Sequence, residues 1–168
     1  MSVRHSLLAI LEQGPCYGYQ LRQEFNRRTG EAWPLNVGQV YTTLDRLERD
    51  GLVTQAGADA EGHVVYAITP SGSASAQEWL AAPVARADRD ELAMKLAIAS
   101  TLPGADPAAI IAAQRLVTSN TAENPVIAAW LVAVAEAEAK WLDVVAELER
   151  RPYGLANDAP KRGRPARL

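Results

Sequence analysis

One predicted helix carries the side chains best suited to contact another molecule. Asn36 is a good N-cap, and the apolar residues between 37 and 47 repeat at intervals of three and four. The opposite, polar face offers Gln39, Tyr41, Thr42, Thr43 and Arg46. Asn36 and Tyr41, with the free backbone N–H groups at the helix start, suit contact with DNA phosphates. Gln can pair with adenine, Arg with guanine or phosphate, and Thr can touch a thymine methyl group. This face suits the DNA major groove, but the pattern also describes an ordinary amphipathic helix with a solvated face.

Helix-capping residues, glycines and prolines, and the spacing of apolar residues predict the elements that would position this helix. Two helices precede it, at about 3–11 and 18–29, and two strands follow it, at 52–56 and 64–69. Four further helices are expected: from Pro70 to about Pro83, at 88–101, from Pro107, and from Pro125 to about Arg150. The fold class is therefore mainly α, with an N-terminal winged helix-turn-helix of three helices and a two-stranded wing. A C-terminal helical region follows it.

The domain division follows from this order. We expect a winged-helix domain at 1–83, a helical dimerisation region at 84–151, and a flexible basic tail at 152–168. With 168 residues and 48% hydrophobic residues, the chain can bury a real core. The 31 alanines favour helix over a β-sandwich.

The charge balance is unfavourable for a nucleic-acid-binding protein. The formal net charge is −3, and the only strongly basic stretch is 161–168, with four bases and no acid. DNA binding would have to rest on local patches.

The composition of the sequence weighs against several other classes of protein. Two His and one Cys leave no set of ligands for a dedicated metal site, and no cofactor motif is present. We find no Ser/His/Asp or Cys/His constellation and expect no enzymatic activity. No apolar run approaches the roughly 20 residues of a membrane span. A single Cys excludes an internal disulfide framework, so we expect a cytoplasmic protein without membrane contact.

Three segments of the chain carry a likeness to one known protein family. Residues 37–53, VGQVYTTLDRLERDGLV, look like the third helix of that family. Residues 7–19 are similar to its first helix, its Gly-Pro turn and the start of its second helix. Residues 66–72, YAITPSG, resemble the segment that closes its wing. Together, over about residues 5–80, these segments resemble the PadR-like family of transcriptional regulators.

The resemblance implies a homodimeric repressor that binds an inverted repeat in double-stranded DNA. Tyr41 and the polar residues around it would contact DNA, and Tyr17 would approach the phosphates. The wing departs from the family pattern, because its tip holds Asp59 and Glu61 and should repel DNA. His63 would contact DNA only if it were protonated or if the loop turned away.

The last predicted helix carries a wide apolar stripe. Its residues alternate at intervals of three and four and include Ile127, Trp130, Val134, Trp141, Val144 and Leu148. We expect this stripe to form the dimer interface; packing within a single chain is the alternative. A dimer would set two recognition helices about one DNA turn, roughly 34 Å, apart.

Three Trp in the helical half suggest where a signal could enter. Flat aromatic walls from Trp79, Trp130 and Trp141 could hold a small hydrophobic or aromatic effector, and core packing is the alternative. Family members commonly respond to such compounds.

The tail contains the sequence Arg162-Gly163-Arg164-Pro165. It resembles an AT-hook, in which Arg side chains lie in a narrow A·T minor groove. A solvated basic tail that adds nonspecific affinity is the alternative. For the whole chain, the alternative function is a helical adaptor or sequestering protein that kept the winged-helix fold and lost DNA binding.

Overall fold

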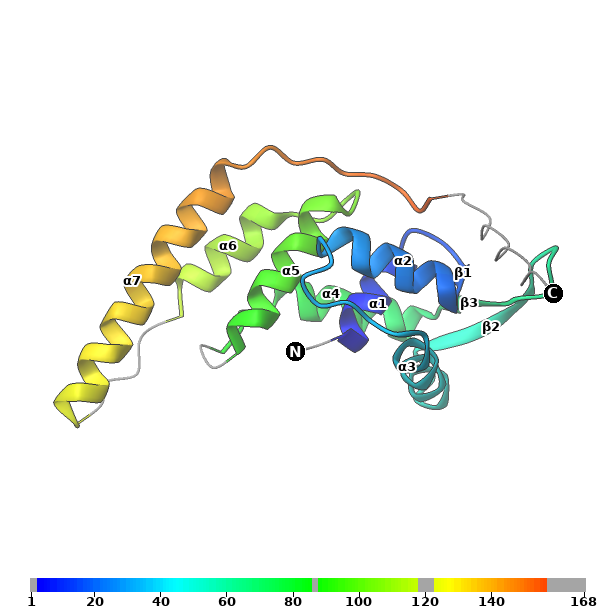
Figure 1. Cartoon of the computed structure of the whole chain (residues 1–168), viewed down its shortest axis with the longest axis horizontal. Coiled ribbons are helices and arrows are strands. Elements are labelled where there is room, and N and C mark those ends of the chain that lie inside the picture. Colours follow the sequence, from blue (N-terminus) through cyan, green and yellow to red (C-terminus); the bar gives the residue numbers. More distant parts are fainter. Residues whose placement is uncertain (1–2, 86–87, 118–122, 157–168) are drawn as a thin grey trace, which may run out of the picture.

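The computed structural model describes residues 3–85, 88–117 and 123–156 (Figure 1). Its elements are α1 (Val3–Leu11), β1 (Cys16–Tyr17), α2 (Gly18–Arg28), α3 (Val37–Arg49), β2 (Val53–Ala58), β3 (Val64–Ile68), α4 (Pro70–Ala81), α5 (Arg89–Thr101), α6 (Pro107–Arg115) and α7 (Pro125–Glu147). The mainly helical winged-helix prediction is confirmed. No helix among the described residues is both long and apolar enough to cross a membrane.

Side-chain caps explain where four of these helices begin. Asn36, Thr69, Asp106 and Asn124 each accept a hydrogen bond from a backbone N–H in the first turn. Proline follows the last three caps, at a position where a helix needs no N–H donor. These local signals are why the predicted starts of the helices agree closely with the observed ones.

The sheet has three strands rather than the two expected for a wing. Its order is β1-β3-β2, and both pairings are antiparallel. The short strand β1 lies beside the wing strand β3, with Cys16 opposite Tyr66 and Tyr17 opposite Val65. Two residues show no alternation of apolar and polar side chains, so sequence periodicity could not reveal β1.

Two hydrophobic clusters hold the molecule together, and α5 contributes to both. The first is built around α1, α2 and α3 and includes Met94 and Ile98 of α5 and Leu102, the residue that follows α5. The second joins α5 to α6 and α7 through Leu92, Leu96 and other apolar residues. A boundary near residue 83 therefore does not coincide with a gap in the core, and the domain division stays a prediction.

The segment after α7 is not a free tail over its whole length. Residues 150–156 run from the end of α7 back across α2 (Figure 1). Tyr153 N–H donates to Thr101 O at 3.0 Å, and Arg28 Nη2 donates to Tyr153 O at 3.1 Å. We call residues 150–156 the C-terminal strap. The rest of the expected tail, 157–168, lies outside the described residues.

Candidate nucleic-acid interface

Helix α3 presents one buried face and one open face. Val40, Leu44 and Leu47 are fully buried in the first cluster. Of the predicted DNA-contacting residues on α3, four are exposed and Thr43 is half-buried; the exposed ones are Gln39, Tyr41, Thr42 and Arg46. Figure 1 places α3 at the edge of the molecule, next to the wing formed by β2 and β3. The open face is thus available to a partner as wide as a duplex groove.

The first turn of α3 is closed by a capping box. Asn36 Oδ1 accepts from Gln39 N–H at 2.8 Å, and Gln39 Oε1 accepts from Asn36 N–H at 3.0 Å. This reciprocal pair fixes the start of the helix. It also uses one of the two lone pairs of the Gln39 amide oxygen, and the NH₂ group of that side chain stays available while the box is closed.

The Tyr41 side chain packs against the start of α2. A Cβ on Gly18 would lie 2.8 Å from Tyr41 Cζ and 2.9 Å from Cε1, so a side chain at position 18 would require the Tyr41 ring to shift. The ring is partly covered on that side, and Tyr41 remains 37% exposed. Sequence analysis missed the role of Gly18, because nothing along the chain shows which side chain a glycine will face.

The structure contradicts the expectation that Tyr17 approaches DNA phosphates. Tyr17 is buried, and its ring stacks on His63 with ring centroids 4.9 Å apart. Burial, followed by the charges of Asp59 and Glu61, raises the pKa of the Tyr17 hydroxyl. The reason is the pairing of β1 with β3, which turns Tyr17 towards the wing.

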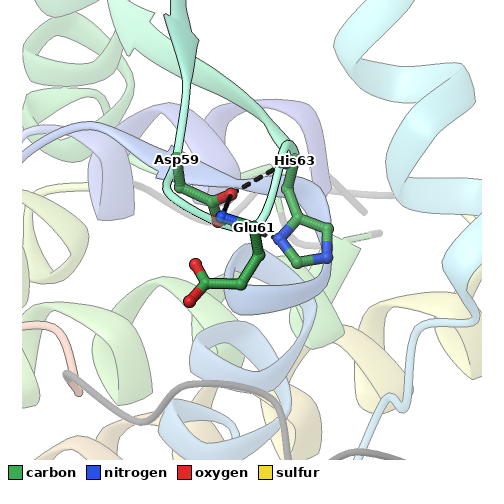
Figure 2. A group of neighbouring side chains, drawn as sticks. All are labelled: Asp59, Glu61 and His63. Carbon is green, nitrogen blue, oxygen red and sulfur yellow. Dashed lines mark hydrogen bonds and ion pairs between the residues drawn. The ribbon is translucent and has the colours of Figure 1, made fainter.

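The tip of the wing is held by bonds among its own polar groups (Figure 2). Asp59 Oδ1 accepts from the backbone N–H groups of Glu61 and His63, at 3.0 and 2.8 Å. Asp59 Oδ2 lies 2.8 Å from His63 Nδ1. Desolvation raises the pKa of Asp59, but the bonds from His63 and Glu61 together outweigh it and hold that pKa below its usual value. His63, predicted to contact DNA, is thus engaged by Asp59 and Tyr17.

The same three residues form the one cluster of metal-ligand type found among the described residues. Asp59, Glu61 and His63 each offer one ligand atom, and these atoms lie within 4.8 Å of one another. The sequence predicts no metal site. The hydrogen bonds of the loop account for this arrangement, which is an Asx-type turn, without a metal ion.

The apolar stripe of α7 is largely uncovered. Among the predicted interface residues, Ile127, Trp130, Val144 and Leu148 are exposed, and Val134 and Trp141 are half-buried. Leu142 is the one described residue of α7 that is buried. The helix rests on α6 and α5 near this residue and leaves much of its apolar surface open. Monomeric proteins rarely expose so large an apolar face.

The three Trp of the helical half do not form one pocket. Trp79 is buried in the first cluster, where its Nε1 donates to Glu91 Oε1 at 2.8 Å and the Lys95 ammonium lies 5.1 Å from its ring. Trp130 is 59% exposed. Trp141 lines a cleft of about 270 Å³ between α5 and α7, together with Asp90, Leu92, Ala93, Ala137 and Glu138. Within one chain the three Trp therefore share no cleft, and Trp141 is the one of them that lines the cleft between α5 and α7. A pocket shared at a dimer contact stays a prediction.

Comparison with known proteins agrees with this arrangement of elements. Residues 7–78 match the model of the transcriptional regulator PadR-like family, a stretch that runs from α1 through the wing into α4. Residues 7–78 of this chain are therefore similar to a PadR-like domain. The match includes α3, the sheet and both helices that brace α3.

Two curated relatives extend the PadR-like match. A probable transcriptional regulator of Mycobacterium tuberculosis is 32% identical over 87 residues, which are 50% of this chain and 46% of that protein. The negative transcriptional regulator PadR of Bacillus subtilis is 26% identical over 106 residues, 60% of this chain and 58% of that protein. The chain thus spans about half the length of the curated relatives that it matches.

Solved structures also resemble this chain. The crystal structure of Bacillus subtilis PadR in complex with operator DNA has a TM-score of 0.44 at 20% identity, over 87% of this chain and 97% of the other. The complex of the same PadR with p-coumaric acid has a TM-score of 0.43 at 20% identity, over 87% of this chain and 98% of the other. A transcriptional regulator from Clostridium thermocellum has a TM-score of 0.43 at 25% identity, over 46% of this chain and 75% of the other.

Proposed function

We propose that this protein is a transcriptional repressor that binds double-stranded DNA as a homodimer, with α3 in the major groove. One observation carries the proposal: the open polar face of α3, backed by three fully buried apolar residues, inside a stretch similar to a PadR-like domain. The two copies of α3 in a two-fold dimer would contact an inverted-repeat operator.

Arg46 is the residue of α3 best suited to specific contact. Its side chain is exposed, and it has no ion-pair partner among the described residues. An unpaired guanidinium can donate two hydrogen bonds to guanine or bind phosphate. Thr42 and Tyr41 flank it on the same open face.

A gel-shift titration at fixed salt tests this docking on the DNA upstream of the protein's own gene. Arg46→Ala should weaken binding to that fragment by about tenfold or more, since one bidentate base contact contributes about 1–3 kcal/mol. The matched control is Arg115→Ala, which removes the same charge from α6, far from α3 in Figure 1. Binding of Arg46→Ala as tight as that of the control would refute the assignment of α3.

The dimer proposal rests on the uncovered stripe of α7. Val126, Trp130 and Leu148 are 72%, 59% and 63% exposed, and burying such side chains contributes about 1.5–3 kcal/mol each. A second copy of the same helix offers a face of matching chemistry. We therefore place the two-fold contact along α7.

Light scattering during size-exclusion chromatography tests this contact. The wild-type chain should run as a dimer, and Trp130→Asp with Val144→Asp should run as a monomer. The control is Ala139→Asp with Ala146→Asp, which adds the same charge at exposed positions away from the stripe. A monomeric wild-type protein, or equal effects of both pairs, would overturn the proposed interface.

The cleft between α5 and α7 is the site that we propose for an effector. Trp141 supplies an aromatic wall, and the carboxyl groups of Asp90 and Glu138 lie at its edge. These charges disfavour an anionic ligand, so a neutral or cationic aromatic compound fits best. Quenching of Trp fluorescence by cationic and by anionic dyes of equal size, with Trp141→Phe as control, distinguishes the two classes.

The second candidate function is an adaptor that no longer binds DNA. The acidic wing tip and the burial of Tyr17 favour it, because both remove contacts that a winged helix could make with phosphates. If the wild-type protein binds DNA no more tightly than the Arg46→Ala variant does, and shows no preference for its own upstream fragment, the adaptor function is the better account.

A further inference from the structure

The C-terminal strap is fastened to α2 by charged groups that are themselves buried. Glu24 and Arg28 are 1% and 3% exposed, and Arg28 Nε donates to Glu24 Oε2 at 3.1 Å. Arg28 Nη2 also donates to Tyr153 O at 3.1 Å, and Ala156 N–H donates to Glu24 Oε1 at 3.1 Å. Gln20 Nε2 donates to Ala156 O at 3.0 Å. Both members of a buried ion pair therefore bind the strap, and buried charges are costly to leave without such partners.

The strap also joins the ends of two helices. Arg28 is the last residue of α2, and Thr101 is the last residue of α5. Thr101 O accepts from Arg28 Nη1 at 2.8 Å and from Tyr153 N–H at 3.0 Å. A carbonyl group at the end of a helix has no partner within that helix, so these bonds satisfy it. Tyr153 thus lies where the ends of α2 and α5 meet.

The side chain of Tyr153 adds a contact of its own. The guanidinium carbons of Arg27 and Arg28 lie 4.0 and 4.4 Å from the centre of its ring. A cation–π contact of this kind needs the aromatic ring and not the hydroxyl group. Leu155, two residues further on, packs against the first hydrophobic cluster. Tyr153 therefore anchors the strap with both its backbone and its ring.

Helix α2 in turn holds the residue that precedes α3. Arg22 Nε donates to Leu35 O at 2.7 Å, and Leu35 N–H donates to Asn26 Oδ1 at 2.9 Å. Leu35 is followed directly by Asn36, the N-cap of α3. Because α2 binds both backbone polar groups of Leu35, a movement of α2 would carry the start of α3 with it. A continuous set of contacts thus leads from the strap through α2 to α3.

The contacts of α7 with α5 and α6 gather in one stretch of that helix. Leu142 is buried there, Gln114 Nε2 donates to Glu138 Oε1 at 3.1 Å, and Arg115 forms an ion pair with Asp143. A helix of 23 residues is about 34 Å long, and a helix that is held over a short stretch can tilt about it. The strap gives α7 a second attachment, because it runs from the end of α7 back across α2 (Figure 1).

We propose that the strap sets the distance between the two copies of α3 in the dimer, and with it the separation of operator half-sites that the dimer accepts. Tyr153 is the positioning residue. This inference rests on the proposed dimeric, DNA-binding function. With the two-fold contact along α7, the position of each α3 relative to the two-fold axis depends on how α2 is held relative to α7. Base pairs are about 3.4 Å apart along the duplex, so a shift of a few ångströms in α3 changes the preferred spacing by one base pair.

Distances between spin labels test the positioning in the absence of DNA. Thr42→Cys places a label on the exposed face of α3 in each copy of the full chain, while Cys16 is 2% exposed and stays unlabelled. Pulsed electron paramagnetic resonance should then give one narrow distribution of distances between the two labels. Adding Tyr153→Ala should broaden or shift that distribution. Tyr153→Phe keeps the ring, and as the matched control it should leave the distribution unchanged.

Operator binding by the unlabelled chain is the second measurement. Footprinting of the DNA upstream of the protein's own gene locates the protected site, and a second duplex carries two base pairs inserted between its halves. The wild-type chain and Tyr153→Phe should each bind the longer duplex about a hundredfold more weakly, because a rigid dimer can no longer reach both half-sites. Tyr153→Ala should lose only about tenfold, since a released domain can still reach both. Reduced stability alone would weaken binding to both duplexes equally, so the ratio of the two affinities reports positioning.

A second variant separates release of the strap from unfolding. Ala156→Pro removes the N–H group that Glu24 accepts and keeps the Tyr153 ring. It should also broaden the distribution of label distances and reduce the loss of affinity for the longer duplex. If Tyr153→Ala lowers the helical circular dichroism signal, Ala156→Pro decides the question.

The possible outcomes distinguish the claims. If the labelled wild-type chain gives no dipolar signal at micromolar concentration, the proposed dimer and the strap inference both fail. If it gives a signal, but the folded Tyr153→Ala and Ala156→Pro variants keep both the wild-type distance distribution and the wild-type loss of affinity, only the strap inference fails. If the distribution broadens while every chain loses affinity equally on the longer duplex, the strap positions α3 but does not set the operator spacing, and that part of the inference is wrong.

Discussion

The ring of Tyr41 on α3 lies against the backbone of Gly18 at the start of α2, so closely that a Cβ at position 18 would come within 2.8 Å of Tyr41 Cζ. The contact fixes the distance between the helix that would enter the groove and the helix that braces it. It also fixes the direction of the one aromatic side chain on the open face of α3.

Gly18→Ala should therefore displace Tyr41 while the fold is kept. The clashing atoms are the far end of a side chain that is 37% exposed and can turn aside, so we expect a loss of no more than about 1 kcal/mol in the free energy of unfolding. A double-mutant cycle with Tyr41→Ala, measured by urea unfolding, tests this contact. Gly18→Ala should lower the free energy of unfolding much less in the Tyr41→Ala background, where the ring is absent. Equal costs in both backgrounds would show that the two residues are not in contact.

Gly72 is a second position where the fold excludes a side chain. A Cβ there would lie 2.0 Å from Leu52 O, which is backbone and cannot turn aside. Thr69 caps the same turn, since its Oγ1 accepts from Gly72 N–H at 3.1 Å and donates to Gly51 O at 2.8 Å. Gly72→Ala should cost at least about 3 kcal/mol in urea unfolding or prevent folding. Gly154→Ala, with nothing within 4 Å of the added carbon, is the control and should be close to neutral.

His5 makes stability depend on pH. Burial, followed by the charge of Arg4, lowers its pKa below 6.5, and its ring stacks on Trp79 at 5.9 Å between centroids. The nearby carboxyl groups of Glu91 and Glu78 oppose this shift, and Lys95 adds to it. Between the folded and the unfolded pKa the unfolded chain binds more protons, so the free energy of unfolding should fall as pH drops below 6.5.

Guanidinium unfolding at several pH values between 7.5 and 5 tests this dependence. His5→Gln should show a smaller decline than the wild-type chain, since the neutral amide takes up no proton. Identical pH profiles for the two proteins would mean that His5 is not the group responsible. His63 is present in both chains and serves as the internal control.

Cys16 should be unreactive in the folded protein. Burial, with a smaller effect of Glu24, raises the pKa of its thiol to about 12, and its side chain is 2% exposed in β1. Only the thiolate attacks a disulfide reagent, so labelling at pH 8 should be slower than that of the unfolded chain by several orders of magnitude. Fast labelling of the native protein would show that β1 opens readily.

The strap is a physical link between α7 and α2. It begins at the helix that we assign to the dimer and ends on the helix that supports Tyr41. A displacement of α7 would therefore pull on Tyr153, and through Arg28 and Glu24 on α2.

Much of the architecture could be predicted from the sequence because its signals are local. Asn36, Thr69, Asp106 and Asn124 mark helix starts through bonds to residues two or three positions away. The spacing of Val40, Leu44 and Leu47 reports one buried face, since neighbours at three and four positions share a side of a helix. The winged-helix plan and the open face of α3 follow from such signals.

The tertiary structure alone decided the features that depend on distant partners. Tyr17 is buried because β1 pairs with β3, and its own neighbours in sequence carry no sign of that pairing. The three Trp are separated because Trp79 packs in one cluster and Trp141 at the edge of another. The strap joins residues more than a hundred positions apart. Contacts of this kind depend on which surfaces meet when the helices pack, and periodicity within one helix cannot specify its neighbours.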